Sequence, residues 1–418
     1  MAGLYIHIPF CASRCIYCGF YSTTRHDLRQ RYVDAVCREM EQRQFAGSQE
    51  WQLDTIYLGG GTPSQLTVQQ LEQLFTSIKK VYRLSSRLDK PGEAPTKSEE
   101  GPERTGQAPQ KPDHGLEVTL ECNPDDITVR YAAILSQLPV NRVSMGVQTF
   151  SDARLRFLRR RHTAAQIPLA VERLRKAGIQ NISIDLMYGF PQETIEDWHY
   201  DIGQALSLGV EHLSAYSLMY EEGTPLYQLI MNNEKTEHKD PRYVPIDEET
   251  ELRMFNDLMD RLTDAGYEHY EISNFAKWKE ENGRRKAESY RSRHNSSYWH
   301  QVPYIGLGAA AHSYDGDSRQ WNVDNVEQYI EGIEHGTPFT EREELDETTK
   351  YNELIMTSLR TCEGLQLNRL DNADKLFCLQ QARRYLDDGL LTLKDNCLQL
   401  SRRGIFVSNM VMSGLMRA

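Results

Sequence analysis

Short apolar runs alternate with amphipathic helical patterns over the first half of the chain. Six runs have the length of strands: residues 4–8, 55–58, 116–121, 142–147, 182–187 and 212–218. Between them, apolar residues recur with helical spacing in 28–45, 68–81, 164–177 and 195–208, with Asp27 and Thr163 expected to cap the first and third helices. This alternation predicts an α/β fold of βα units around a parallel sheet, open or closed into a partial barrel. The chemistry of such folds lies at the C-terminal ends of the strands.

The pattern changes towards the C-terminus. Residues 344–418 are mostly helical and include a short alternating stretch at 398–400. Helices followed by a small hairpin predict a winged-helix-like C-terminal domain, after a core domain at 1–225 and a connecting region at 226–343. Such modules often bind DNA, but the acidity of this chain favours packing or docking of a partner protein.

One segment of the core domain differs in composition from everything around it. Residues 89–115 contain five Pro and four Gly in 27 positions, and no Val, Ile, Leu, Met or aromatic residue. Such a segment cannot bury enough apolar area to offset its ordering entropy. We therefore expect it to be a disordered surface insertion.

Charge and hydropathy narrow the function classes. The chain has 48 Lys and Arg against 60 Asp and Glu, a net charge of −12, which argues against nucleic acid as the main partner. No apolar run approaches the roughly 20 residues of a spanning helix, and the N-terminus shows no basic and apolar leader. We expect neither secretion nor a membrane span, and a cytoplasmic location.

Three of the eight cysteines are clustered. Cys11, Cys15 and Cys18 follow directly on the first predicted strand, whereas the other five are scattered. Clustering without pairing indicates a metal in a reducing compartment. Three thiolates on one loop can hold three irons of a 4Fe-4S cluster and leave the fourth iron open. Zinc is the alternative metal, but it usually needs a fourth ligand nearby, and neither His7 nor His26 gives a zinc-finger spacing.

Polar and glycine residues stand at the ends of the following strands. Gly59, Gly60, Gly61 and Thr62 follow the second strand, where bare backbone and a hydroxyl can approach a small ligand, although a glycine-rich turn is more often only a tight turn. Asp185 lies within an apolar run, where a carboxylate is costly unless it is paired or bonded to a ligand. We therefore interpret Asp185 as a site residue.

These motifs together resemble a known superfamily. The cysteine spacing, with Tyr17 before the last Cys and Tyr5-Ile-His-Ile-Pro-Phe before the first, resembles radical S-adenosylmethionine (SAM) proteins. The branch it resembles contains oxygen-independent coproporphyrinogen oxidase and the HemW haem chaperones, and the chain is most like the HemW haem chaperones. The resemblance implies a partial (β/α)6 TIM-like barrel, a 4Fe-4S cluster whose open iron chelates SAM, and reductive cleavage of SAM to a 5′-deoxyadenosyl radical.

The resemblance also implies which residues contact SAM. They are Tyr5, Tyr17, Gly60, Gly61, Thr62, Glu121, Gln148, Arg160 and Asp185. The run Arg159-Arg160-Arg161 leaves open which of the three arginines points inward. Glu121, taken alone, would be a solvated strand end in most proteins. Cys122 has no matching role and is expected in the core.

A second motif lies in the connecting region, which we expect to lie beyond the sheet. His294, Asn295, Tyr298 and Trp299 resemble the HNxxYW element that is associated with haem binding in HemW proteins. A lone histidine is more often structural, and His312 is not assigned as a ligand. The resemblance implies haem as cargo, an unknown haem-accepting protein and an electron donor.

Two departures from the oxidase favour the chaperone branch. The oxidase has a further Cys two positions after the third, where this chain has Phe20. It also has an N-terminal extension that helps to enclose the substrate, whereas only four residues precede Tyr5 here. We therefore expect a haem chaperone without coproporphyrinogen oxidase activity. The alternative is an oxygen-independent coproporphyrinogen III oxidase, which decarboxylates propionates oxidatively. Radical modification of RNA, a third class, is disfavoured by the net charge.

Overall fold

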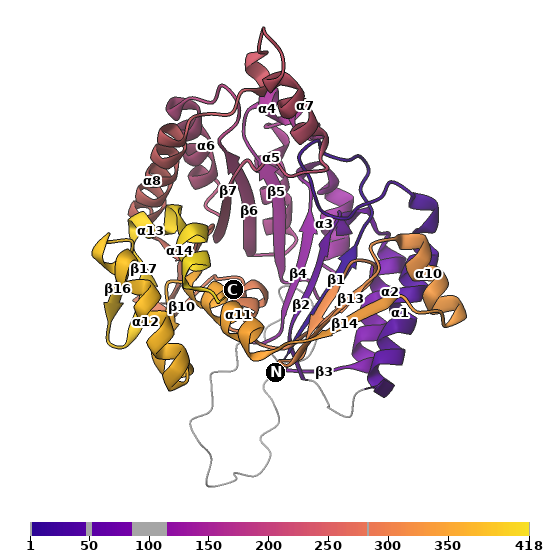
Figure 1. Cartoon of the computed structure of the whole chain (residues 1–418). Coiled ribbons are helices and arrows are strands. Elements are labelled where there is room, and N and C mark those ends of the chain that lie inside the picture. Colours follow the sequence, from indigo (N-terminus) through magenta and orange to yellow (C-terminus); the bar gives the residue numbers. More distant parts are fainter. Residues whose placement is uncertain (1, 47–51, 86–114, 282–283, 418) are drawn as a thin grey trace.

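The computed structural model describes residues 2–46, 52–85, 115–281 and 284–417. The proposed insertion, apart from Gly115, lies outside these residues. One large sheet curves through the molecule, with helices on its outer side and an open interior (Figure 1). No helix in the described ranges combines the length and apolar character needed to cross a bilayer.

Six parallel strands form the centre of this sheet, in the order β7-β6-β5-β4-β2-β1. They are β1 (Ala2–Ile8), β2 (Gln52–Gly60), β4 (Glu117–Cys122), β5 (Arg142–Gln148), β6 (Asn181–Tyr188) and β7 (His212–Ser217). All six coincide with predicted strands. Within the described residues, the end strands β10 and β14 are not paired with each other, so the barrel is partial, as predicted.

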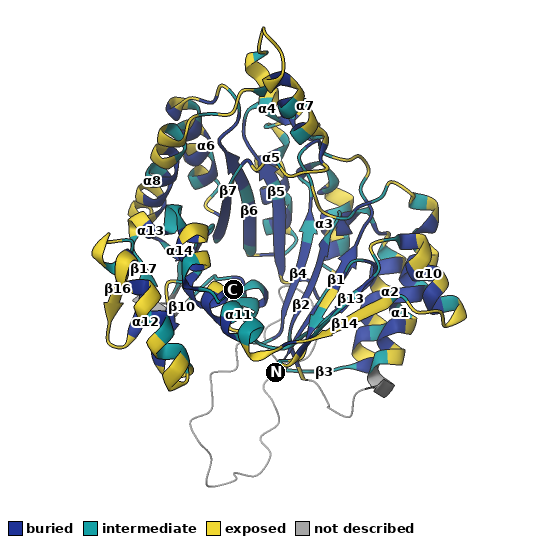
Figure 2. Ribbon diagram, in the orientation of Figure 1, coloured by how far each residue is buried: buried dark blue, intermediate teal, exposed yellow. Residues whose placement is uncertain are grey.

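Helices follow the strands and cover the outer face. They are α1 (Arg29–Ala46), α2 (Val68–Val81), α3 (Val129–Leu135), α4 (Asp152–Phe157), α5 (Gln166–Lys176), α6 (Ile195–Ser207), α7 (Pro225–Glu234) and α8 (Glu248–Asp264). Alternate strand residues such as Val143, Met145 and Val147 pack against these helices in one large apolar core. Burial follows this layering, with dark strands inside and exposed outer helix faces (Figure 2).

The connecting region extends the sheet instead of lying beyond it, which corrects our expectation. β11 (Tyr304–Leu307) pairs in parallel with β1 and is followed by β12 (His312–Tyr314), β13 (Ser318–Asn322) and β14 (Thr340–Glu344). At the other edge, β9 (Asn274–Glu281) pairs with β7, β8 (Tyr267–Glu271) and β10 (Arg284–Ser289). The short β3 (Arg83–Leu84) pairs with β2. Two further helices complete the region, α9 (Arg293–Trp299) and α10 (Val326–His335).

The C-terminal part is helical with a small sheet of its own, as predicted. Its helices are α11 (Glu347–Leu359), α12 (Asn372–Asp387), α13 (Arg402–Phe406) and α14 (Ser408–Leu415). The hairpin of β16 (Leu391–Lys394) and β17 (Cys397–Leu400) joins β15 (Leu365–Gln366) in a three-stranded sheet. Tyr351, Ile355 and Tyr385 belong to a second apolar core under these elements.

The two predicted helix caps are wrong. Asp27 lies inside a one-turn 3-10 helix, His26–Leu28, and its carboxylate accepts hydrogen bonds from Arg25 at 2.9 and 3.0 Å. Helix α5 begins two residues later than predicted, after Ala165, and the Thr163 hydroxyl donates to the Gln166 side chain at 3.4 Å. In both cases a neighbouring side chain competes for the group that would form the cap.

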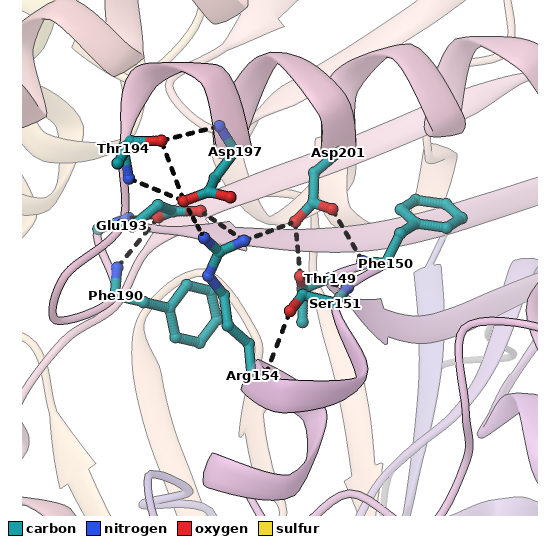
Figure 3. Close-up of polar contacts among 10 residues, drawn as sticks. Thr149, Phe150, Ser151, Arg154, Phe190, Glu193, Thr194, Asp197 and Asp201 are labelled. Atoms are coloured by element: carbon teal, nitrogen blue, oxygen red, sulfur yellow. Dashed lines mark hydrogen bonds and ion pairs between the residues drawn. The ribbon is translucent and has the colours of Figure 1, made fainter. Parts of the chain in front are cut away.

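A buried ionic cluster connects the start of α6 to α4 (Figure 3). Arg154 on α4 lies 2.7 Å from Asp197, 3.5 Å from Glu193 and 4.0 Å from Asp201. The Glu193 and Asp201 side chains are fully buried. Three carboxylates share one guanidinium, so the cluster has more acidic than basic groups. Burial accordingly raises the pKa of Glu193 to about 7.

The same carboxylates hold the loops that follow β5 and β6. Asp201 accepts hydrogen bonds from the Thr149 hydroxyl at 2.6 Å and the Phe150 N–H at 2.9 Å. Glu193 accepts from the N–H groups of Gly189 at 2.7 Å and Phe190 at 3.1 Å. The cluster therefore fixes the C-terminal ends of two strands, at the edge where active chemistry is expected.

We predict that Glu193→Gln stabilises the protein more at pH 8 than at pH 6. The pKa of Glu193 is higher in the folded chain than in the unfolded one, so the free energy of unfolding of wild type falls as pH rises through 7. A glutamine side chain does not ionise, so the variant does not lose this stability. The free energy of unfolding of the variant relative to wild type therefore rises by about 1 kcal/mol from pH 6 to pH 8. Urea unfolding followed by circular dichroism measures this difference, with Glu196→Gln, an exposed residue in the first turn of α6, as control. An equal effect at both pH values would contradict the assignment.

Candidate functional site

The inner face of the sheet encloses a cavity of about 530 Å³. Side chains from all six central parallel strands line it, together with the cysteine loop and α9. The alternation of a strand places every second residue inside, as Arg142, Ser144 and Gly146 on β5 illustrate. Every predicted contact of the cluster and of SAM lines this one cavity.

The cysteine loop lies at one end of the cavity, between β1 and α1. Its base is closed by hydrogen bonds between Cys11 and Thr23 at 2.9 Å and between Thr23 and Pro9 at 2.7 Å. The Sγ of Cys11 lies 3.4 Å from the Thr62 hydroxyl. Cys11, Cys15 and Cys18 are all half-buried free thiols that line the cavity.

The three thiols lie on one loop, which suits the ligands of a 4Fe-4S cluster. A zinc site needs its ligands to converge on one point. A cubane has no such need, because each thiolate binds a different iron. Burial raises the pKa of Cys11 and Cys18, so these thiols lose their protons when metal binds.

The glycine-rich turn after β2 meets Glu121 at the end of β4. Gly60 has a φ of 104° and donates its N–H to Glu121 at 3.1 Å. The Tyr57 hydroxyl donates to the other oxygen of the same carboxylate at 2.6 Å. Burial raises the pKa of Glu121 to about 7, although the residue keeps some exposure to the cavity. The turn thus presents backbone and a carboxylate to a ligand.

Arg160 is the arginine that turns inward. Its guanidinium donates to the Asn123 side chain and the Gly146 carbonyl, and its Nη1 lies 3.7 Å from the Sγ of Cys15. A Cβ on Gly146 would lie 3.1 Å from the guanidinium, so glycine makes room for it. Arg161 instead pairs with Asp125 at 2.7 Å.

Asn123 is a site residue that the sequence reasoning missed. Besides accepting from Arg160, it donates to Thr62 at 3.4 Å, so it joins three of the strand ends around the cavity. Its position directly before Pro124 and two residues after Glu121 was the available signal.

Three further predicted contacts also line the cavity. The Tyr5 hydroxyl is 3.0 Å from Nδ1 of His7. Gln148 ends β5 at a bulge with a φ of 70°, a strained conformation of the kind that gathers at functional sites. Asp185 lies 3.5 Å from the Ser144 hydroxyl, and burial raises its pKa to about 6.

His294 on α9 is held in a hydrogen-bonded network inside the barrel. Its Nδ1 lies 2.8 Å from the Thr55 hydroxyl and its Nε2 lies 2.8 Å from the Tyr298 hydroxyl. Its ring stacks on Tyr57 at 5.0 Å. Burial lowers the pKa of His294 to about 3, so the imidazole is neutral. Either ring nitrogen could bind iron only by exchanging a hydrogen bond that it already makes.

The structure brings three of the four proposed haem residues to the cavity. His294, Asn295 and Tyr298 line it, whereas Trp299 does not. The Trp299 ring lies against the guanidinium of Arg360, 4.6 Å away, towards the C-terminal part.

Comparison with known proteins identifies the family of this chain. The radical SAM superfamily model matches residues 5–203, and the HemN C-terminal domain model matches residues 345–407. The chain is 32% identical to the heme chaperone HemW of Bacillus subtilis, over 98% of each chain. It is 33% identical to the heme chaperone HemW of Lactococcus lactis, over 89% of this chain and 84% of the relative.

The chain belongs to the HemW family of radical SAM proteins. Membership implies a 4Fe-4S cluster and SAM as cofactors. Among solved structures, the chain is similar to coproporphyrinogen III oxidase (HemN) from Escherichia coli, a radical SAM enzyme, with a TM-score of 0.78. That match has 21% identity and covers 99% of this chain and 90% of the oxidase, so it establishes the shared fold.

We predict that replacing Cys11, Cys15 or Cys18 by Ala abolishes the broad iron-sulfur absorbance of the anaerobically reconstituted protein. Each thiol is expected to hold a separate iron, so none can substitute for another. The matched control is Cys122→Ala, a buried thiol that also lines the cavity and should be dispensable. A full cluster in the triple variant, or stoichiometric zinc in anaerobically prepared protein, would contradict the assignment.

Proposed function

We propose that this protein is a haem chaperone that binds haem in its cavity and transfers it to an acceptor protein. The observation that carries the proposal is that His294, Asn295 and Tyr298 of the HNxxYW element line the same cavity as the three cysteines. The names of the relatives from Bacillus subtilis and Lactococcus lactis support it.

The cluster is assigned to the cysteine loop, and the proposed SAM contacts extend from it to Tyr5, which also borders the aromatic rings beside α9. Cys11, Cys15 and Cys18 hold the cluster, which when bound supplies an electron for the cleavage of SAM. The proposed SAM contacts are Tyr5, Tyr17, Gly60, Gly61, Thr62, Glu121, Gln148, Arg160 and Asp185. Arg160 and Asn123 orient this end, because they connect the cysteine loop to the ends of β4 and β5.

The haem end of the cavity is aromatic. Tyr5, Tyr57, His294 and Tyr298 form a series of rings whose neighbouring centroids lie between 5.0 and 6.5 Å apart. Flat apolar surfaces of this kind suit the face of a porphyrin. Because both nitrogens of His294 are engaged, we assign His294 to the positioning of Thr55 and Tyr298 and leave the iron ligand unassigned.

Phe20 distinguishes the chaperone from its alternative. It lines the cavity with 71% of its surface exposed, at the position where the oxidase has a further Cys. A large exposed apolar side chain at a cavity mouth is suited to contact with an apolar ligand or a partner. The alternative function is that of an oxygen-independent coproporphyrinogen III oxidase. The observation that supports it is the fold shared with HemN over nearly the whole chain.

The partners follow from the chemistry. Besides haem, the function needs an acceptor protein and, for reduction of the cluster, an electron donor. All eight cysteines lie among the described residues and are free thiols, which fits a reducing compartment such as the cytoplasm.

We predict that Tyr298→Ala weakens haem binding by about tenfold or more, because it removes an aromatic wall from the cavity. Haem titration followed by absorbance measures the dissociation constant. Trp299→Phe is the matched control, since its ring lies outside the cavity, and it should bind haem like wild type. Equal losses in both variants, or a loss of cluster absorbance in Tyr298→Ala, would contradict a direct contact.

We also predict that the protein, with a full cluster, SAM and reductant under strict anaerobiosis, does not convert coproporphyrinogen III to protoporphyrinogen IX. Product analysis by chromatography checks this. Robust turnover would overturn the chaperone proposal in favour of the oxidase. A protein that shows neither turnover nor haem affinity would instead act on another class of substrate.

A further inference from the structure

Arg142 is a buried cation with no partner among the described residues. It begins β5, its residue is 1% exposed, and it lines the cavity. No hydrogen bond or ion pair of its side chain occurs among the described residues, and its Nε and Nη1 are enclosed without an acceptor. Buried charges in proteins are normally paired and hydrogen-bonded, because desolvation of an unpaired charge is costly. A buried, unpaired arginine of this kind is stabilised when an anion binds to it.

The groups that face Arg142 do not supply that anion. Thr119, its neighbour across the β4–β5 register, has a fully buried hydroxyl that also lacks a partner. His294 and His212 are near enough for Arg142 to lower the pKa of each further, after burial, so both imidazoles are neutral. These neighbours are polar but uncharged.

Two carboxylates and two phenols lie within electrostatic range. Burial raises the pKa of Glu121 and Asp185, and the charge of Arg142 offsets part of that rise, but neither carboxylate forms an ion pair with it. Their own contacts are with Tyr57 and Gly60 in one case and Ser144 in the other. The Tyr57 and Tyr270 hydroxyls are neutral at physiological pH.

The position of Arg142 separates it from the cofactor end. Gly146, four residues further along β5, contacts Arg160 beside the cysteine loop. Four residues of a strand span about 13 Å, so the two arginines lie at different depths of the cavity. Arg142 shares its depth with the aromatic wall, because Tyr57 pairs with Thr119 and Thr119 with Arg142.

We propose that Arg142 binds a carboxylate of the cargo, namely a propionate of the porphyrin, whose ring lies against Tyr57, His294 and Tyr298. This inference rests on the proposed function and adds the part of the ligand that is recognised. A guanidinium suits the role because its planar fork can donate two parallel hydrogen bonds to one carboxylate.

The test compares haem with haem dimethyl ester, in which both propionates are uncharged. Wild type should bind haem at least about tenfold more tightly than the ester, since a charge-assisted bond to a carboxylate is lost. Arg142→Met should lose about tenfold in haem affinity and bind haem and ester equally. Arg142→Lys should keep part of the preference. Arg161→Met is the control and should keep all of it, because Arg161 already pairs with Asp125.

Cluster absorbance and SAM affinity are measured on every variant. Unchanged values with loss of the preference support the inference. An unchanged preference in Arg142→Met, or a loss of SAM affinity with haem binding intact, overturns it. If Arg142→Met does not fold, Arg142→Lys decides, and a full preference there overturns the inference. Wild type that binds neither haem nor its ester refutes the proposed function instead.

Discussion

The parallel register of six strands is the constraint on which the rest of the molecule depends. Because adjacent strands are paired residue by residue, every second side chain points into one shared interior. Helices cover the other face with apolar side chains, so the interior is free to be polar. Residues that lie far apart in the sequence thereby become neighbours around a cavity.

The polar groups of the interior are buried, and burial shifts their pKa values. Burial raises the pKa of Glu121 and Asp185 and lowers that of His294. The cavity also contains two arginines, Arg142 and Arg160, at different depths. Arg160 donates hydrogen bonds to Asn123 and a backbone carbonyl and lies beside the cysteine loop, whereas Arg142 makes no hydrogen bond or ion pair among the described residues. Outside the interior, the Arg154 cluster holds the strand ends that carry Gln148 and the loop after Asp185 (Figure 3).

Much of the fold could be predicted because its signals are local. The six central strands were found from their apolar runs, and α2 was predicted with its observed bounds. The caps at Asp27 and Thr163 were wrong, since the side chains of Arg25 and Gln166 take up the groups that would form the caps. The connecting region was misplaced because β11 pairs with β1, a contact between segments that lie far apart in the sequence.

The sequence by itself determined the cysteine loop, the glycine-rich turn and the HNxxYW element, because each is a short run whose spacing carries its chemistry. Only the tertiary structure decided which of three consecutive arginines faces inward, that Trp299 turns away from the cavity, and that Arg142 has no partner within the described part of the chain. Those outcomes depend on contacts between distant segments, such as the bond between Thr55 and His294 across 239 residues. Local sequence patterns do not encode such pairings, because the pairings depend on how distant elements pack together.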